Sequence, residues 1–512
     1  MAWLHTWAGV GVSALLFAII WMGSLSVFDR EIDRWMAPMT RLPGLSEPPL
    51  LDAAVVPVVE KLAGQSALWI LELPSERTAT LRLFWRDTDG KNHTRHLDPV
   101  RGALLPDAGS HAGTGFIYPF HFRLHISFMD IGYWLVGFAA MAMLVAIVSG
   151  VVVHKKIFRD FFTFRPRKHT QRAALDLHNL TGVLAMPFHF VIALSGLMIF
   201  FAIYFPSAWQ VAYPGNKQAF NNDARDSFQR GKARQRGELG SLDAMLAQAR
   251  RAWGSGEVSQ VRMHHPGDAN AYVEVRRSPA RQVTRDTQSV YFDAASGVML
   301  ARSQVRPAKS VLNFVTGLHM VQFSHWTLRW LYFLAGLTGC VMLATGLLVW
   351  LEARRVQHAK QGLTGVRVVE ALAVAAVPGI MLATCAFFVV NRLLPLGASF
   401  AGGTRAELEM WAFYLAWGLS LAHAAWRGRS AWAEQSAALS VLALAAVLLN
   451  WFTTGDHLLR TLGNADFAIA GMDSLLLLGA ATAAWAARGL HRRAARQTGA
   501  PAPLLGRRAD YA

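Results

Sequence analysis

Residues 164–205 read FRPRKHTQRAALDLHNLTGVLAMPFHFVIALSGLMIFFAIYF, and this stretch decides the fold class. A basic flank comes first, and the apolar run behind it is long enough to cross a bilayer. The run carries His178 at its entrance and His189 well inside it. Eleven residues at about 100° each return a helix to within roughly 20°, so both histidines should share one face, about 16 Å apart. An ionisable side chain inside a membrane helix is costly and therefore indicates function.

Composition places the whole chain among membrane proteins. Its 512 residues are 53% hydrophobic and 16% charged, and several apolar runs approach bilayer-spanning length. Much of the basic charge lies in short loops and tails at the ends of these runs. This positive-inside pattern favours contact with membrane lipid and excludes nucleic acid as the expected partner. Cys340 and Cys385 both lie in apolar runs, so neither a disulfide framework nor a CxxC cluster is expected.

The sequence predicts a polytopic α-helical membrane protein with about eight spans. Basic clusters fall on one side of an eight-span topology, which places both termini in the cytoplasm and two small α+β domains outside. The predicted parts are span one at 1–28, external domain one at 29–124, span two at 125–153, a basic cytoplasmic loop at 154–176, span three at 177–205, external domain two at 206–318, span four at 319–352, a C-terminal module of four further spans at 367–490, and a cytoplasmic tail at 491–512.

A span–domain–span unit occurs twice in the first two thirds of the chain. HTWAGVGVSALLFAIIWMG at 5–23 and HNLTGVLAMPFHFVIALSG at 178–196 share a first-position histidine and glycines at the fifth and nineteenth positions. The repeat therefore places His5 and His178 at matching cytoplasmic ends and His125 and His319 at matching external ends. Further matched pairs are Ser149-Gly150 with Thr345-Gly346, and Asp98/Gly102 with Asp293/Gly297.

The match between the external histidines is less exact than the cytoplasmic one. His125 lies nine residues, and His319 eleven residues, before the tryptophan of the following span. Two residues rotate a helix by about 200°, so their equivalence requires a bulge or a helix start in between. His121 and His325 are rival external candidates. His189 is either a ligand or a polar contact inside the helix bundle.

Histidines at both membrane faces predict b-type haem. Neutral imidazole is a usual axial ligand, and two imidazoles from different helices can hold one macrocycle without covalent attachment. Two such haems, one near each face, would conduct electrons through the bilayer, and glycines such as Gly9 and Gly182 would leave room for a flat ring. No C-x-x-C-H sequence is present for covalent haem. The candidate haem-iron ligands are His5, His178, His125 and His319, with His189 and His325 as further cofactor-binding candidates.

HTWAGV, the DLHN…PFH block of residues 164–205, and the LH…SG and LH…TG spans resemble the PepSY-associated transmembrane helix family. The resemblance covers about residues 1–356 and implies a bacterial inner-membrane protein with PepSY-like periplasmic domains. Some members resemble or are ferric-siderophore reductases with two b-type haems. The family likeness thus implies electrons passing from a quinol or a cytoplasmic reductase to a ferric siderophore or other ferric chelate outside. It says nothing about the last four spans.

A haem-dependent reductase of this kind needs no bond-making side chain, so no catalytic residue is assigned. Hard oxygen ligands hold Fe(III), and one electron weakens that grip. No G-x-G-x-x-G after a strand and no Walker A motif is present, so the electron donor should be a separate molecule. The alternatives are a siderophore permease, a non-catalytic membrane sensor or assembly protein, and a haem protein that reduces a quinone or a periplasmic redox protein.

Overall fold

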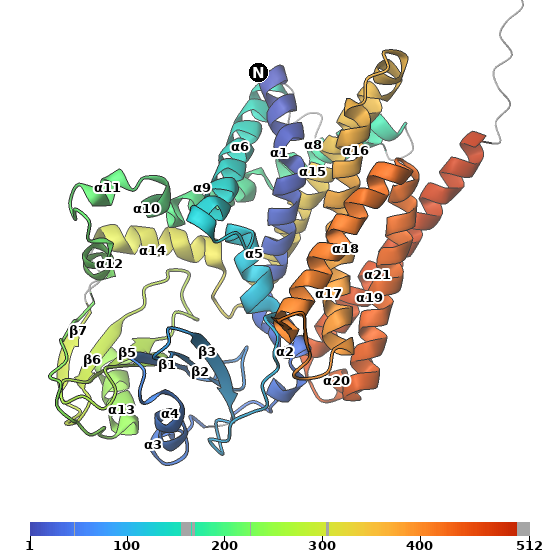
Figure 1. The fold of residues 1–512 in the computed structure, drawn as a ribbon. Coiled ribbons are helices and arrows are strands. Elements are labelled where there is room, and N and C mark those ends of the chain that lie inside the picture. The colour runs from blue at the N-terminus through green and yellow to red at the C-terminus, as the bar shows by residue number, and fades with distance from the viewer. Residues whose placement is uncertain (46, 155–164, 166–168, 226, 304–306, 499–512) are drawn as a thin grey trace, which may run out of the picture. The chain divides into compact units, whose positions relative to one another are not determined.

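The computed structural model describes residues 1–45, 47–154, 165, 169–225, 227–303 and 307–498 (Figure 1). Most of the predicted basic loop at 154–176 and much of the predicted tail at 491–512 lie outside the described residues. The chain forms two compact units. The first comprises Met1–Ala353 with Leu396–Ala406, and the second comprises Arg354–Pro395 with Glu407–Ala512. The first unit therefore contains the whole predicted repeat.

Six helices in the described ranges are long and apolar enough to cross a membrane, or seven if one bent pair counts as a span. Those of the first unit are α1 (Ala2–Ser26), α6 (Ile131–Val153), α15 (Trp326–Lys360) and the bent pair α8 (Thr170–Leu184) and α9 (Met186–Ile199). The prediction of one continuous helix through His178 and His189 was wrong, because the pair bends by 65° around Ala185. Pro187 in the first turn of α9 supplies no backbone N–H for a bond back into α8.

The second unit is built from helices that follow the predicted C-terminal runs. They are α16 (Gly365–Val374), the π-helical turn η4 (Ala375–Gly379), α17 (Ile380–Leu393), α18 (Arg405–Arg427), α19 (Ser430–Thr454), α20 (Leu458–Gly463) and α21 (Phe467–Thr498). Trp417 Nε1 donates to Ala375 O at 2.9 Å and so satisfies a carbonyl of the π-helical turn. The module predicted at 367–490 contains three of the six apolar spans, because the continuous helix α18 is not among them.

Within the described residues, the two segments predicted to be external form one seven-stranded antiparallel sheet in the order β3-β2-β1-β4-β5-β6-β7. The strands are β1 (Leu68–Glu72), β2 (Leu81–Arg86), β3 (Asn92–Leu97), β4 (Val258–His264), β5 (Tyr272–Arg277), β6 (Ser289–Asp293) and β7 (Met299–Arg302). The prediction of two separate small domains at 29–124 and 206–318 is therefore corrected. The edges of β1 and β4 pair with each other, which removes two open sheet edges from solvent.

The two halves of this external domain are related by the internal repeat. Each half places a helix against the sheet, α3 (Leu51–Ala54) and α4 (Val56–Ala63) in the first half and α13 (Leu242–Trp253) in the second. Asp52 accepts a hydrogen bond from Leu242 N at 2.8 Å, and Asp243 accepts one from Leu51 N at 2.9 Å. Each aspartate thus caps the helix start of the opposite half. This reciprocity confirms the repeat and holds the halves together.

Short elements connect the sheet to the spanning helices, and Figure 1 shows α5 and α14 among them. α5 ends before Leu124 and His125, both in the left-handed conformation, and α6 begins only at Ile131. The chain therefore breaks between the external histidines and span two, as their unequal spacing required. The connecting elements are α2 (Asp29–Met36), η1 (Pro38–Thr40), η2 (Ala112–Ile117), α5 (Tyr118–Arg123), η3 (Phe128–Asp130), α10 (Phe201–Tyr204), α11 (Ser207–Gln210), α12 (Lys217–Arg225) and α14 (Pro307–Met320). The short strands β8 (Ser399–Phe400) and β9 (Gly403–Thr404) lie between α17 and α18 and pair with each other.

Candidate functional site

An inner histidine pair, His5 and His178, brings the first and second repeats together. The centres of the two imidazole rings are 6.3 Å apart, and the rings are inclined by 76°. His5 on α1 donates from Nδ1 to Ala146 O on α6 at 2.9 Å. His178 on α8 donates from Nδ1 to Met342 O on α15 at 2.8 Å. Each ring is thus fixed against a helix of its own repeat and faces the ring of the other.

An outer histidine pair is formed by His121 and His319. Their ring centres are 6.0 Å apart and the rings are inclined by 29°. His121 on α5 donates from Nδ1 to Ile19 O on α1 at 2.8 Å. His319 on α14 donates from Nδ1 to Ile192 O on α9 at 3.0 Å. The sequence placed His319 in this position, but the structure sets His121 opposite it, where the repeat had suggested His125.

A glycine four residues after each accepting carbonyl lets the imidazole lie against the helix. A Cβ added at any of these glycines would come within 2.6 to 3.2 Å of the nearest imidazole atom. Residues four apart lie on one helix face, so carbonyl and glycine together form a seat for the ring. The four seats are Ala146 with Gly150, Met342 with Gly346, Ile19 with Gly23, and Ile192 with Gly196. By contrast, Gly9 has open space and Gly182 meets Met342, so neither seats a histidine.

The hydrogen bonds fix the protonation of all four rings. A carbonyl oxygen can only accept, so Nδ1 carries a proton, and in the neutral ring Nε2 then keeps its lone pair. Among the described residues, no hydrogen bond involves Nε2 of any of the four. Two imidazoles bound to opposite sides of one metal at about 2 Å would have ring centres roughly 6 Å apart. The ring separation in both pairs therefore fits two histidines that would hold one metal, such as the iron of a haem.

The other predicted ligands lie elsewhere. His125 donates from Nε2 to Phe116 O at 2.7 Å and stacks on the Phe116 ring. His325 is exposed, and its Nδ1 accepts from Leu328 N at the start of α15. His189 is buried and donates from Nε2 to Ala335 O at 3.1 Å, while its Nδ1 has no hydrogen-bond partner in the described part of the chain. None of these three faces a second histidine ring among the described residues.

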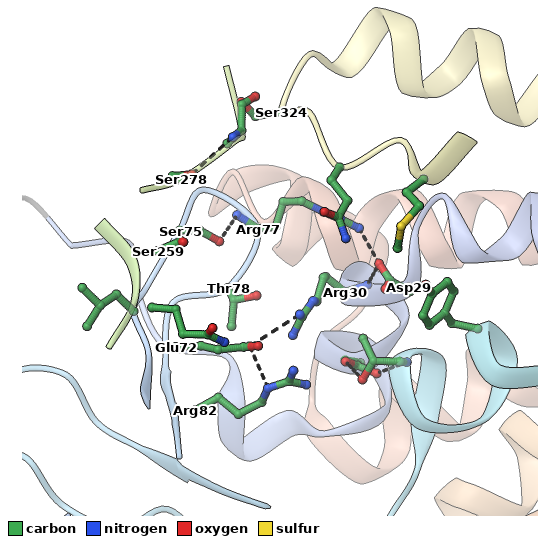
Figure 2. A pocket seen from close by; sticks show the side chains of 18 of the residues that line it. Asp29, Arg30, Glu72, Ser75, Arg77, Thr78, Arg82, Ser259, Ser278 and Ser324 are labelled. Carbon is green, nitrogen blue, oxygen red and sulfur yellow. Dashed lines mark hydrogen bonds and ion pairs between the residues drawn. The ribbon is translucent and has the colours of Figure 1, made fainter. Parts of the chain in front are cut away.

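An open cleft with a volume of about 1230 Å³ lies between the outer pair and the seven-stranded sheet, and His121, His319 and Gly23 are part of its lining. Its other walls come from α2, from strands β1, β2, β4 and β5, and from the loop at 278–285. Figure 2 shows arginine, carboxylate and hydroxyl side chains gathered around it. The sequence did not predict this cleft, because residues from both repeats form it.

Ion pairs organise one wall of the cleft. Glu72 accepts from Arg82 at 2.9 Å and lies 3.5 Å from Arg30 (Figure 2). Although burial opposes ionisation, Arg82 and Arg30 hold the pKa of Glu72 below its usual value. Asp33 behaves differently, since burial, opposed by Arg30, raises its pKa to about 6. Thr114 donates to both Asp33 oxygens, from its backbone N at 2.9 Å and its hydroxyl at 2.7 Å.

The family described as the PepSY-associated TM region matches residues 2–353. The chain belongs to this family. One similar protein is an uncharacterised protein of Pseudomonas aeruginosa, 29% identical over 240 residues, which are 43% of this chain and 59% of the relative. The chain thus spans less than two thirds of that relative's length. The PepSY-associated TM region holds both histidine pairs and the cleft, and it ends before the C-terminal helices.

A buried ion network joins the two repeats of the PepSY-associated TM region, and sequence analysis missed it. Arg329 on α15 is fully buried and donates to both oxygens of Glu31 on α2, at 3.1 and 2.9 Å. Arg77 donates to the same carboxylate at 3.0 and 2.7 Å. Although burial opposes ionisation, these arginines lower the pKa of Glu31 to about 2. An arginine near the start of an otherwise apolar run was the available signal.

Proposed function

We propose that this chain is a haem-dependent oxidoreductase of the bacterial inner membrane that reduces ferric siderophores or other ferric chelates on the periplasmic side. The observation that carries the proposal is the pairing of four histidines whose Nδ1 atoms are bound to helix carbonyls. His5 with His178, and His121 with His319, would each hold one b-type haem. Haem would supply a reversible one-electron change at each pair.

The residues of the chain then act by orientation and access. Carbonyl seats hold each imidazole with its Nε2 lone pair directed away from the bonded helix, and such support is typical of metal-binding histidines. The cleft beside the outer pair is wide enough for a bulky chelate. One electron from a quinol or a cytoplasmic reductase would convert one chelated Fe(III) to Fe(II), which oxygen ligands hold less tightly. Both chain termini would lie in the cytoplasm.

The test is a reduced-minus-oxidised absorption spectrum with a haem count on the purified protein. About two b-type haems per chain are expected. His121→Ala should lose about one of them, because it removes one axial ligand of the outer pair. His125→Ala is the matched control, since His125 bonds to Phe116 O and should leave both haems in place. Oxidation of the reduced protein by a ferric chelate would complete the evidence, and a folded but colourless protein would refute the proposal.

A permease is the second candidate function, and one observation favours it. The α8–α9 pair bends by 65° within a stretch that would otherwise be one span. Broken spans are a common feature of transporter binding sites. Proteoliposomes separate the two candidates, because a permease would accumulate a redox-inert gallium chelate in its intact form. The proposed reductase would leave that chelate outside and would act only on iron.

A further inference from the structure

The external cleft carries more cationic than anionic side chains. Among the described residues that line it, eight arginines stand against five carboxylates. The arginines are Arg30, Arg34, Arg77, Arg82, Arg262, Arg277, Arg281 and Arg285, and the carboxylates are Asp29, Asp33, Glu72, Glu76 and Glu257. Guanidinium groups present a planar fork of donors that matches the oxygens of carboxylates and similar anions. The walls of the cleft thus favour an oxygen-rich anion.

Most of the carboxylates in the lining form ion pairs with arginines of the same lining. Asp29 pairs with Arg77 at 2.8 Å, and Glu72 serves both Arg30 and Arg82. On the rim, Glu257 lies 3.6 Å from Arg281, with both side chains mostly exposed. Most of the negative charge in the lining is therefore already matched by arginine. With eight arginines against five carboxylates, the described lining keeps a net excess of positive charge.

Arg277 at the end of β5 is the clearest member of that excess. Its guanidinium donates to Gln288 Oε1 at 3.1 Å and to Ser255 Oγ at 3.3 Å, and both partners are neutral. No carboxylate pairs with it in the described part of the chain. Gly256, at a positive φ of 105°, lets the neighbouring loop lie against the guanidinium, where a Cβ would fall 2.4 Å from Nε. Neutral partners thus fix the orientation of the Arg277 guanidinium and leave its positive charge unpaired by a carboxylate.

Hydroxyl groups around the arginines add further donors. Figure 2 shows Ser75, Thr78, Ser259, Ser278 and Ser324 distributed around the same pocket. Hydroxyls can donate to phenolate or carboxylate oxygens while guanidinium groups supply charge. A concave surface with one excess sign of charge also concentrates ligands of the opposite sign.

We infer that the cleft selects anionic ferric chelates over neutral and cationic ones, with Arg277 as a binding residue. The inference rests on the proposed function for the kind of substrate and adds the charge that the substrate must carry. The chelate's outward-facing anionic oxygens would meet Arg277 and the other wall arginines. The outer histidine pair is part of the same cleft lining.

Redox-inert gallium(III) chelates test this inference without electron transfer. Binding of a trianionic tris-catecholate complex, a neutral trihydroxamate complex and a cationic trihydroxamate complex to the purified haem-loaded protein would be measured by calorimetry. The trianionic complex should bind at least about tenfold more tightly than the others, and its affinity should fall as salt is added. Arg277→Gln should weaken the trianionic complex by about tenfold and leave the neutral one unchanged. The haem spectrum should not change.

Arg101→Gln is the control, because Arg101 is an exposed arginine of the same external domain outside the cleft lining. Equal affinities for the three charges, no measurable binding, or equal losses in the Arg277 and Arg101 variants would each overturn the inference. Its failure is distinguishable from failure of the proposed function. Oxidation of the reduced protein by ferric chelates, irrespective of their charge, would uphold the reductase even if the gallium complexes showed no selectivity.

Discussion

The inner and outer histidine pairs share one construction and differ in what surrounds them. In both pairs, one ring comes from each repeat and each ring is seated on a carbonyl and a glycine of its own repeat. The inner rings belong to the spanning helices α1 and α8, whereas the outer rings belong to the short helices α5 and α14. Only the outer pair is part of the cleft lining among the described residues. Equal seats thus support one pair on the long spanning helices and one pair on short helices beside an open cleft.

The largest expected effect comes from the ion network of α2, which directly follows α1 at its sheet-side end. Glu31→Ala would leave Arg329 and Arg77 without their shared carboxylate, and Arg329 is fully buried. Removing one partner of a buried ion pair costs about 3–5 kcal/mol. Thermal unfolding in detergent should show this loss, and the outer haem should be lost before the inner one. Arg101→Ala, at an exposed site, should cost less than about 0.5 kcal/mol. Equal unfolding temperatures for the Glu31 and Arg101 variants would contradict the stabilising role of the network.

A second prediction compares how strongly the outer and inner histidine pairs depend on their glycine seats for haem binding. Gly23→Ala would place a Cβ 2.6 Å from His121, so the ring must move and about one of two haems should be lost. Gly150→Ala would place a Cβ 3.1 Å from His5 and should weaken the inner haem less. Haem counts on both variants measure the difference. Gly9→Ala enters open space and should retain both haems; haem loss there would show that the effect is not local.

A third prediction concerns the buried histidine between the pairs. His189→Leu removes a hydrogen bond to Ala335 O and should cost about 1–3 kcal/mol of stability, because that carbonyl loses its side-chain partner. The haem count should stay unchanged, since no second histidine faces His189 in the described ranges. Unfolding and haem content of the same sample measure both outcomes. Loss of haem in this variant would mean that His189 is a ligand.

The smallest effect is a pH dependence specific to the outer side. Because burial raises the pKa of Asp33 to about 6, ionising it in the folded state costs stability. Its stabilising contribution is therefore full below the usual carboxyl pKa and is lost as pH rises through about 6. Asp33→Asn should lose less stability than the parent protein between pH 4 and pH 7, measured by thermal unfolding. Stability profiles that run parallel over this pH range would contradict this expectation. Glu31 and Glu72, whose lowered pKa values make stability rise with pH, are present in both proteins, so their contribution cancels in the comparison.

The sequence predicted local elements well because their signals are local. The two segments predicted as α+β do contain both kinds of element, including strands at 68–72 and 81–86 and a helix at 242–253. Among the shared glycines of the repeat, Gly23, Gly196, Gly150 and Gly346 seat a histidine, whereas the prediction that Gly9 and Gly182 leave room for the ring has no counterpart in the seats. The exchange of His125 for His121 depends on two left-handed residues, Leu124 and His125, which spacing alone does not reveal.

Long-range pairing was beyond prediction for a different reason. The sequence predicted α+β structure in each of the two segments but could not show that β1 and β4 join the segments edge to edge. The same limit hid the cleft and the contact between Glu31 and Arg329, which are far apart in the chain. Each of these features depends on which segments meet in space, and residue patterns within one segment carry no information about that.

The β1–β4 pairing also determines when, during synthesis of the chain, the sheet can be completed. Leu68 pairs with His264, about 200 residues later in the chain. If the proposed topology holds, the ribosome must deliver two further spans before the partner of β1 reaches the outside. During that delay β1 has an unpaired edge, a site where other chains can add strands. The nascent first half would then depend on chaperones of the external compartment, and a chain truncated between the repeats would remain their client.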